Sequence, residues 1–173
     1  MLVFGGYSGE WILFTRGLAN SSRANVPSVD GGGAVPDPSF IDGLGPQADG
    51  WFSALSWNRG ISDGQDFMDA FTKQYDIPMN GQIAFCYQSI LVIRHVLNET
   101  KSLDSQKIND ALHNLDIPKN DVDNVMPGFG PLKIDPSTGQ SVNAKWVVGQ
   151  VQNSKINLVW PETTGTVAIQ PAG

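Results

Sequence analysis

The sequence predicts an α/β fold, because short apolar runs in its first third alternate with stretches of helical periodicity. Residues 1–57 contain three such runs separated by two helical stretches, and a strand–helix–strand order at this spacing predicts parallel strands. Residues 62–116 have helical patterns throughout, with no strand on which those helices could pack. The chain is therefore expected to combine part of a parallel sheet with a separate helical segment.

Residues 2–29 predict a strand, a helix and a second strand. Leu2–Phe4 is an apolar run that ends at two glycines. From Glu10 to Leu18 apolar side chains recur at helical spacing, and the helix ends at Asn20 and the two serines that follow. The second strand is expected at Val26–Val29.

A short helix and a third strand follow. Ser39 can cap the helix, because its hydroxyl accepts a hydrogen bond from the backbone of the first turn. The third strand is expected at Ala48–Trp57, which is rich in aromatic and apolar residues and follows a turn at Gly43–Pro46.

Three helices are expected in the segment 62–116. The first is capped by Ser62 or Asp63 and ends before Pro78. The second, residues 83–97, is apolar nearly all round and should be buried between neighbours. The third is capped by Asp104 or Ser105 and carries one apolar stripe.

The end of the chain predicts a β-hairpin. Residues 145–152 and 155–160 flank the turn Asn153–Ser154, and Ile156, Leu158 and Trp160 alternate onto one face. The tail 162–173 has little to bury and is expected to be poorly ordered.

Composition excludes several classes of function. The chain has 173 residues, a formal charge of −6 and no cluster of Lys or Arg, so we expect no nucleic-acid or membrane-surface partner. No run is long and apolar enough to span a bilayer, and residues 1–4 lack the features of a signal peptide. Cys86 is the single cysteine, so no internal disulfide can form, and it is expected to be a small core residue.

Catalytic and metal-binding patterns are weak. Ser8 lacks the glycine two places later that a nucleophile elbow requires, and Phe4 stands where a dinucleotide-binding loop needs its first glycine. Two histidines and one cysteine make a protein-built zinc site improbable, and Asp121 and Asp123 are expected in a solvated turn. We expect no enzyme activity, no cofactor and no metal.

The clearest ligand-facing candidate is Asp30, followed by Gly31 and two more glycines at the end of the second predicted strand. Open α/β sheets bind ligands at the carboxyl ends of their strands, and glycines let the backbone approach a ligand. The residue types alone also fit a plain flexible loop.

Four short segments and a closing group form a pattern when they are taken together. The four segments are Val3–Tyr7, Val29–Gly33, Ala48–Trp51 and Ala84–Tyr87. The closing group consists of Gly130–Asp135, Gly139–Gln140, Val151–Asn153 and Val159–Pro161. The pattern resembles the second half of a type I periplasmic solute-binding protein of the branched-chain amino-acid transporter class. The closing group is the most specific part of the match. Gln88 departs from the family, because an acid is common at that position.

The resemblance implies a Rossmann-like parallel sheet lobe, present in part, plus a helical segment that belongs to the other lobe of a two-lobed fold. Residues 1–57 and 135–173 would form part of the second lobe and residues 58–134 the helical segment of the first. The N-terminal half of the family fold would then be absent from this chain, and exposed apolar lobe surfaces could support a homo-oligomer.

For function, the resemblance implies binding of an amino acid or a related small polar solute for an ABC permease, in the periplasm or outside the cell. Tyr7 would contact the solute and Asp30 would pair with its ammonium group, with Gly31 beside it. Ser8 and Gln82 are weaker candidates by position. Two alternatives stay open: a self-associating, ligand-sensing module of the same half-fold, and, less favoured, a dinucleotide-binding or hydrolase domain.

Overall fold

The structure is a computed structural model that describes all residues except 32, 58–64, 78, 127–129, 163–164 and 172–173. The chain divides into two compact units. Unit 1 comprises Met1–Ile61 and Trp146–Gly173, and unit 2 comprises Ser62–Lys145. The boundaries differ from those expected from the sequence, because residues 135–145 lie in unit 2. The assignment of the units to two lobes stays a prediction.

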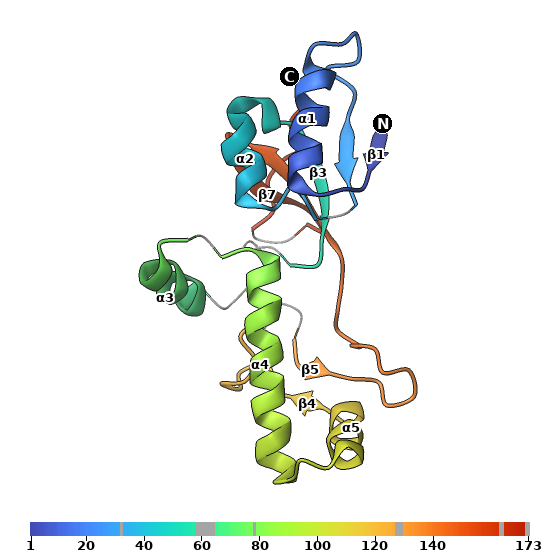
Figure 1. Ribbon diagram of the computed structural model, residues 1–173, viewed down its shortest axis with the longest axis vertical. Helices are drawn as coiled ribbons and strands as arrows, with labels where there is room; N and C mark the ends of the chain where they lie inside the picture. The colour runs from blue at the N-terminus through green and yellow to red at the C-terminus, as the bar shows by residue number, and fades with distance from the viewer. Residues whose placement is uncertain (32, 58–64, 78, 127–129, 163–164, 172–173) are drawn as a thin grey trace. The chain divides into compact units, whose positions relative to one another are not determined.

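Unit 1 is built on one five-stranded sheet with the order β1-β2-β3-β6-β7 (Figure 1). The first three strands, β1 (Leu2–Phe4), β2 (Ser28–Asp30) and β3 (Phe52–Leu55), are parallel, as the sequence predicts. The hairpin strands β6 (Val147–Gln152) and β7 (Lys155–Trp160) add to β3 in antiparallel orientation. The sheet is therefore mixed, and its α/β class is confirmed.

The third predicted strand is shorter than expected. Residues 45–48 form a 3₁₀ turn after the helix α2 (Pro38–Leu44), and the backbone carbonyl of Ala48 accepts a hydrogen bond from the N–H of Trp51. Extended pairing begins only at Phe52. The prediction of a strand from Ala48 was wrong, because Pro46 and Gly50 favour a turn over a strand interior.

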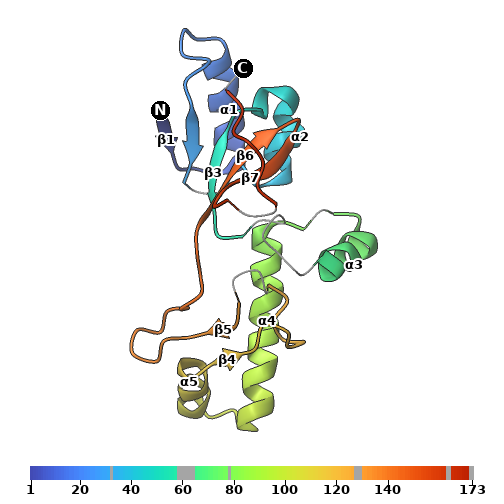
Figure 2. The same ribbon diagram turned by 180° about the vertical axis from the view of Figure 1, so that it is seen from behind.

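Helices α1 (Ser8–Ala19) and α2 (Pro38–Leu44) cover one face of this sheet (Figures 1 and 2). The cap of α2 is Asp37, whose carboxylate accepts a hydrogen bond from the Ser39 N–H at 2.8 Å, so the prediction of Ser39 as the cap was wrong. Trp11 of α1 packs edge to face on Trp51 with ring centroids 4.7 Å apart, and both side chains are buried. The aromatic rings that surround this pair are those of Phe4, Phe14 and Phe40. This aromatic core fixes α1 and α2 on the sheet.

The hairpin turn forms where it was predicted. Asn153 and Ser154 have φ values of 54° and 56°, typical of a tight hairpin turn. The side chain of Asp49 accepts hydrogen bonds from their N–H groups at 3.1 and 2.8 Å. The predicted alternation of β7 fails at its end: an irregularity opposite Val148 shifts the register, so Trp160 is 56% exposed.

The tail is ordered along the sheet, so the prediction of a poorly ordered end was wrong for residues 165–171. The buried side chain of Gln150 donates to the carbonyl oxygen of Gln170 at 2.7 Å and accepts from its N–H at 2.9 Å. Gln152 donates to the carbonyl of Ala168 at 2.9 Å. Hydrogen bonds to these two glutamines thus hold the tail, which buries little apolar surface.

Unit 2 contains α3 (Gln65–Tyr75), α4 (Gly81–Thr100), α5 (Ser105–His113) and a two-stranded ribbon of β4 (Asp116–Ile117) and β5 (Leu132–Lys133). The three helices confirm the sequence prediction, and Asp104 caps α5 through the Lys107 N–H at 3.0 Å. The ribbon is an addition that the sequence pattern did not show. The predicted caps Ser62 and Asp63, and Pro78, lie outside the described residues.

The long helix α4 is less buried than its apolar sequence predicts. Val96 packs on Leu115 and Ile117 in the core of this unit, whereas Ile90 and Ile93 are 65% and 52% exposed. Cys86 is also exposed, so its prediction as a core residue was wrong. The physical reason is that the described elements of unit 2 are too few to cover the whole circumference of α4.

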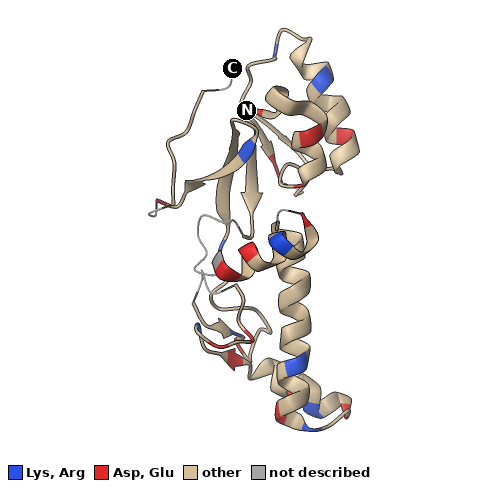
Figure 3. Cartoon of the chain, turned by 90° about the vertical axis from the view of Figure 1, so that its left-hand side faces the viewer, with Lys and Arg blue, Asp and Glu red and all other residues tan. Residues whose placement is uncertain are grey.

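Charge is spread thinly over both units, and the Lys and Arg positions of Figure 3 are scattered over several elements without forming a run. Among the described residues, no helix combines the length and apolar character needed to cross a bilayer.

Candidate functional site

The carboxyl ends of β1 and β2 lie in register at one edge of the unit 1 sheet, beside the first half of β3, which continues for two residues to Leu55. Phe4 pairs with Asp30, and Asp30 pairs with Ser53 on the next strand. The β1–α1 connection and the β2–α2 connection therefore leave the sheet side by side. Parallel sheets place their ligand sites at this edge, because the loops there face one another and the adjacent helices begin there.

Asp30 is fully buried at this edge. Its Oδ2 accepts hydrogen bonds from the backbone N–H of Val35 at 3.0 Å and from the hydroxyl of Ser53 at 3.2 Å. Val35 belongs to the aromatic and aliphatic core of the unit, so the carboxylate points toward the helix-covered face. The carboxylate thus bonds to the backbone of Val35, a core residue that follows the three glycines.

The loop residues beside Asp30 are more accessible. Gly31 is exposed, and its N–H donates to the carbonyl oxygen of Phe4 at 3.1 Å, which ties the loop to the end of β1. Tyr7 precedes α1 and is 85% exposed, while its N–H donates to the Glu10 carboxylate at 3.0 Å. Ser8 is half-buried as the first residue of α1.

Unit 1 thus brings four predicted site residues, Tyr7, Ser8, Asp30 and Gly31, to one edge of its sheet. The fifth, Gln82, is exposed in the first turn of α4 and belongs to unit 2. Its part in any shared site stays a prediction.

Ser53 is the residue that sequence reasoning missed at this edge. It is fully buried although serine favours solvent, and its hydroxyl donates a hydrogen bond to Asp30. The signal in the sequence is a single serine in the middle of an otherwise apolar strand. Such a residue requires a buried partner.

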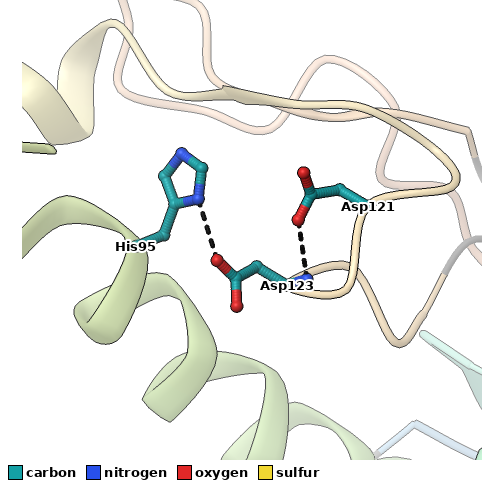
Figure 4. A group of neighbouring side chains, drawn as sticks. All are labelled: His95, Asp121 and Asp123. Atoms are coloured by element: carbon teal, nitrogen blue, oxygen red, sulfur yellow. Dashed lines mark hydrogen bonds and ion pairs between the residues drawn. The ribbon is translucent and has the colours of Figure 1, made fainter. Parts of the chain in front are cut away.

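A second polar cluster lies in unit 2 (Figure 4). His95 Nδ1 is 3.0 Å from Asp123 Oδ2, and Arg94 forms a hydrogen-bonded ion pair with the other oxygen of Asp123. Asp121 accepts from the N–H of Asp123 at 2.8 Å. The prediction of a solvated turn was wrong for Asp123, which is buried.

The hydrogen bond from Arg94 holds the pKa of Asp123 below its ordinary value, against the opposing effect of burial, and His95 adds to the lowering. Gln88 completes the clamp: it donates to the carbonyl oxygen of Asp123 at 2.6 Å and accepts from the Val125 N–H at 3.0 Å. One potential metal-ligand atom of each of His95, Asp121 and Asp123 lies within 4.8 Å of the other two, a spacing that could hold a metal ion. Because Arg94 already neutralises Asp123, the cluster fits an ion-paired anchor for residues 118–126 better than a cation site.

No family model and no curated protein sequence matches the chain. Solved structures do. A leucine-binding protein from Thermotoga maritima has a TM-score of 0.70 at 18% identity, and the match covers 90% of this chain and 42% of that one. A solute-binding protein of an ABC transporter from Rhodopseudomonas palustris, solved with 3,4-dihydroxybenzoic acid, has a TM-score of 0.68 at 20% identity, covering 99% of this chain and 45% of that one.

A third match, to a protein described as a putative branched-chain amino acid ABC transporter from Rhodospirillum rubrum, has a TM-score of 0.60 at 19% identity and covers 89% of this chain and 42% of that one. The expected resemblance is confirmed at the level of fold: the chain has the fold of part of a type I periplasmic solute-binding protein. It spans less than half the length of each of these proteins.

Proposed function

We propose that this chain is part of a two-lobed solute-binding protein that delivers an amino acid or a related small polar molecule to an ABC permease. The observation that carries the proposal is the edge formed by the aligned ends of β1 and β2 beside β3, where the N–H of Gly31 bonds to the carbonyl of Phe4 and Tyr7 follows β1. Such a binding protein works in the periplasm or outside the cell.

Tyr7 and Gly31 are the proposed contact residues of this edge. An exposed tyrosine offers a solute an aromatic face and a hydroxyl, and the glycine lets a solute approach the backbone closely. Ser8 and Gln82 are included as further candidates. Two structural neighbours, the leucine-binding protein and the solute-binding protein solved with 3,4-dihydroxybenzoic acid, support a small carboxylate-bearing solute.

The proposed role of Asp30 is more limited than the pairing with an ammonium group that the sequence suggested. A direct contact between its carboxylate and an ammonium group requires the loop of residues 31–35 to move, because the side chain is fully buried and bonded to Val35 and Ser53. We propose that Asp30 acts mainly by holding Gly31 in place at the edge.

The proposed role is binding without catalysis. Ser8 opens a helix in unit 1, whereas His95 and His113 belong to unit 2. There His95 contacts Asp123 and His113 contacts the carbonyl oxygen of Pro136 at 3.1 Å. Each histidine thus has a structural partner of its own.

The test is an NMR titration of the isotope-labelled 173-residue chain with leucine at millimolar concentration. We expect shifts of the backbone amides of residues 5–8 and of Gly31, with weak affinity because the chain is less than half as long as the matched binding proteins. Tyr7→Ala should abolish these shifts, while Tyr75→Ala, which removes another exposed tyrosine, should preserve them. Shifts that cluster away from this edge, with leucine and with a wider set of amino acids, would overturn the proposal.

A second candidate is a self-associating module of the same half-fold, which the exposed apolar side chains of α4 favour. Phe85, Ile90 and Ile93 are 41%, 65% and 52% exposed on one helix. Two copies that pack these faces together would remove them from water. Sedimentation equilibrium separates the candidates: a dimer that Ile90→Lys dissociates supports self-association, and a monomer over the whole concentration range excludes it.

A further inference from the structure

Unit 1 contains a cavity at the edge of the sheet opposite the proposed solute site. Its volume is about 300 Å³, and it lies between the end of α1, the start of β2 and the turn that leads into β3. Thr15, Leu18, Val26, Ser28, Asp49 and Trp51 contribute to its wall. Because β2 and β3 begin here and end at the other edge, this cavity cannot be part of the site at their carboxyl ends.

The described wall of the cavity is rich in hydrogen-bond acceptors. Asp49 supplies a carboxylate, Ser28 and Thr15 supply hydroxyls, and Gln47 supplies an amide. None of the described residues that line the cavity is Lys, Arg or His. Anions are therefore disfavoured, and molecules that donate hydrogen bonds are favoured.

Thr15 carries a polar group that the described residues leave unsatisfied. Thr15 is 3% exposed, and among the described residues its Oγ1 has no hydrogen-bond partner. A helical threonine ordinarily bonds to the carbonyl oxygen four residues earlier, which this hydroxyl does not do. Because Thr15 is one of the residues that line the cavity, a molecule bound there can supply the partner that its hydroxyl lacks.

The remaining wall is fixed before any ligand arrives. The N–H groups of Asn153 and Ser154 hold the carboxylate of Asp49 at 3.1 and 2.8 Å, and the hydroxyl of Ser28 donates to the carbonyl of Val26 at 2.9 Å. Trp51 is held by its contact with Trp11. An aromatic wall beside a carboxylate suits a planar cation or amide.

We propose that this cavity is a second binding site, which takes a small planar molecule that donates hydrogen bonds and is neutral or positively charged, with Asp49 and Thr15 as its polar partners. The proposal rests on unit 1 alone and does not depend on the function proposed above.

Three planar probes of similar shape and different charge test the site on the full chain: benzamidinium, benzamide and benzoate. In NMR titrations we expect the first two to shift the backbone amides of Ala24, Val26, Gly50 and Trp51, and benzoate to leave them unchanged. Thr15→Val should weaken the binding of both probes about fivefold, the loss expected for one hydrogen bond, and Thr15→Ser should restore it.

Two further variants separate the contributions. Asp49→Asn should weaken benzamidinium and leave benzamide unchanged, because only the cation gains from the carboxylate charge. Ala24→Phe should exclude both probes, since Ala24 is an exposed residue in the wall and the larger side chain fills the cavity without disturbing the core. Benzoate binding as tightly as benzamidinium, wild-type binding by Thr15→Val, or no shift at these amides with either probe would each overturn the proposal.

Discussion

The backbone N–H of Val35 donates a hydrogen bond to Oδ2 of Asp30 over 3.0 Å, so the loop after β2 folds back onto the carboxylate that ends this strand. The same oxygen accepts from Ser53 on β3. One buried side chain thus connects a strand end, a neighbouring strand and the start of the segment that leads to α2. The glycine loop is held by this contact at the point where a solute would meet it.

Replacing Asp30 with alanine should lower the free energy of unfolding of unit 1 by about 3 kcal/mol, because two buried donors lose their acceptor. Asp30→Asn keeps an acceptor oxygen and should cost less than Asp30→Ala. The measurement is urea unfolding followed by tryptophan fluorescence, which reports on unit 1, since all five tryptophans lie in it. Asp42→Ala, an exposed acid on α2, should stay within about 0.5 kcal/mol of the wild type. Equal losses for Asp30→Ala and Asp42→Ala would refute the structural role.

Trp11 should carry a large share of the stability of unit 1. It is fully buried, and Trp11→Ala removes the ring that contacts Trp51, Phe14 and Phe40, so we expect a loss of about 4 kcal/mol or failure to fold. Trp11→Phe keeps an aromatic ring and should cost less. Leu13→Ala on the same helix is the matched control, because Leu13 is 71% exposed and should be close to neutral. Thermal melts of the three variants rank them.

The clamp at Asp123 should make unit 2 sensitive to acid. The Arg94 hydrogen bond lowers the pKa of Asp123 in the folded chain below its ordinary value of 3.8, so this group stabilises the fold above pH 3.8. That contribution is lost as the pH falls through the lowered folded pKa.

Asp123→Asn should therefore be less stable than the wild type at neutral pH, and the difference should shrink below pH 3.8. Amide exchange at Val125, whose N–H donates to Gln88 in the same clamp, measures the effect locally. Asp110→Asn, an exposed acid on α5, is the control and should leave Val125 protection unchanged. A difference that is constant from neutral to acid pH would contradict the ionic contribution of Asp123.

The order of the C-terminal tail should depend on Gln150. Gln150→Leu removes both hydrogen bonds to Gln170, so we expect faster proteolysis within residues 165–171 at unchanged cleavage elsewhere. Gln140→Leu, a substitution of an exposed glutamine in unit 2, should leave the cleavage pattern as in the wild type. Limited proteolysis read by mass spectrometry distinguishes the two. Equal cleavage rates in both variants would show that the glutamine bonds do not hold the tail.

Calorimetry should detect no affinity for leucine tighter than the millimolar range in this chain. The match covers less than half of the length of these binding proteins, so we expect the chain by itself to supply only part of the contacts of the proposed site. Tight, saturable binding by the monomeric chain would contradict this expectation.

Local sequence patterns determined most of the secondary structure. The glycines after Phe4, the cap at Asp104 and the Asn153–Ser154 turn act through neighbouring backbone groups, so a short window of sequence contains the information. The spacing of strands and helices predicted the parallel order of the first three strands. Several weak motifs, taken together, indicated the resemblance to solute-binding proteins.

Tertiary structure alone decided how polar groups are used. Asp30 looked like a ligand-facing acid and Asp123 like a solvated one, yet both are buried, because partners distant in sequence satisfy them: Ser53 for the first, Arg94 and His95 for the second. Gln150 likewise orders a tail that has little apolar surface. Sequence spacing reveals which backbone groups are near neighbours, but whether a charge meets solvent, a ligand or another side chain depends on long-range packing.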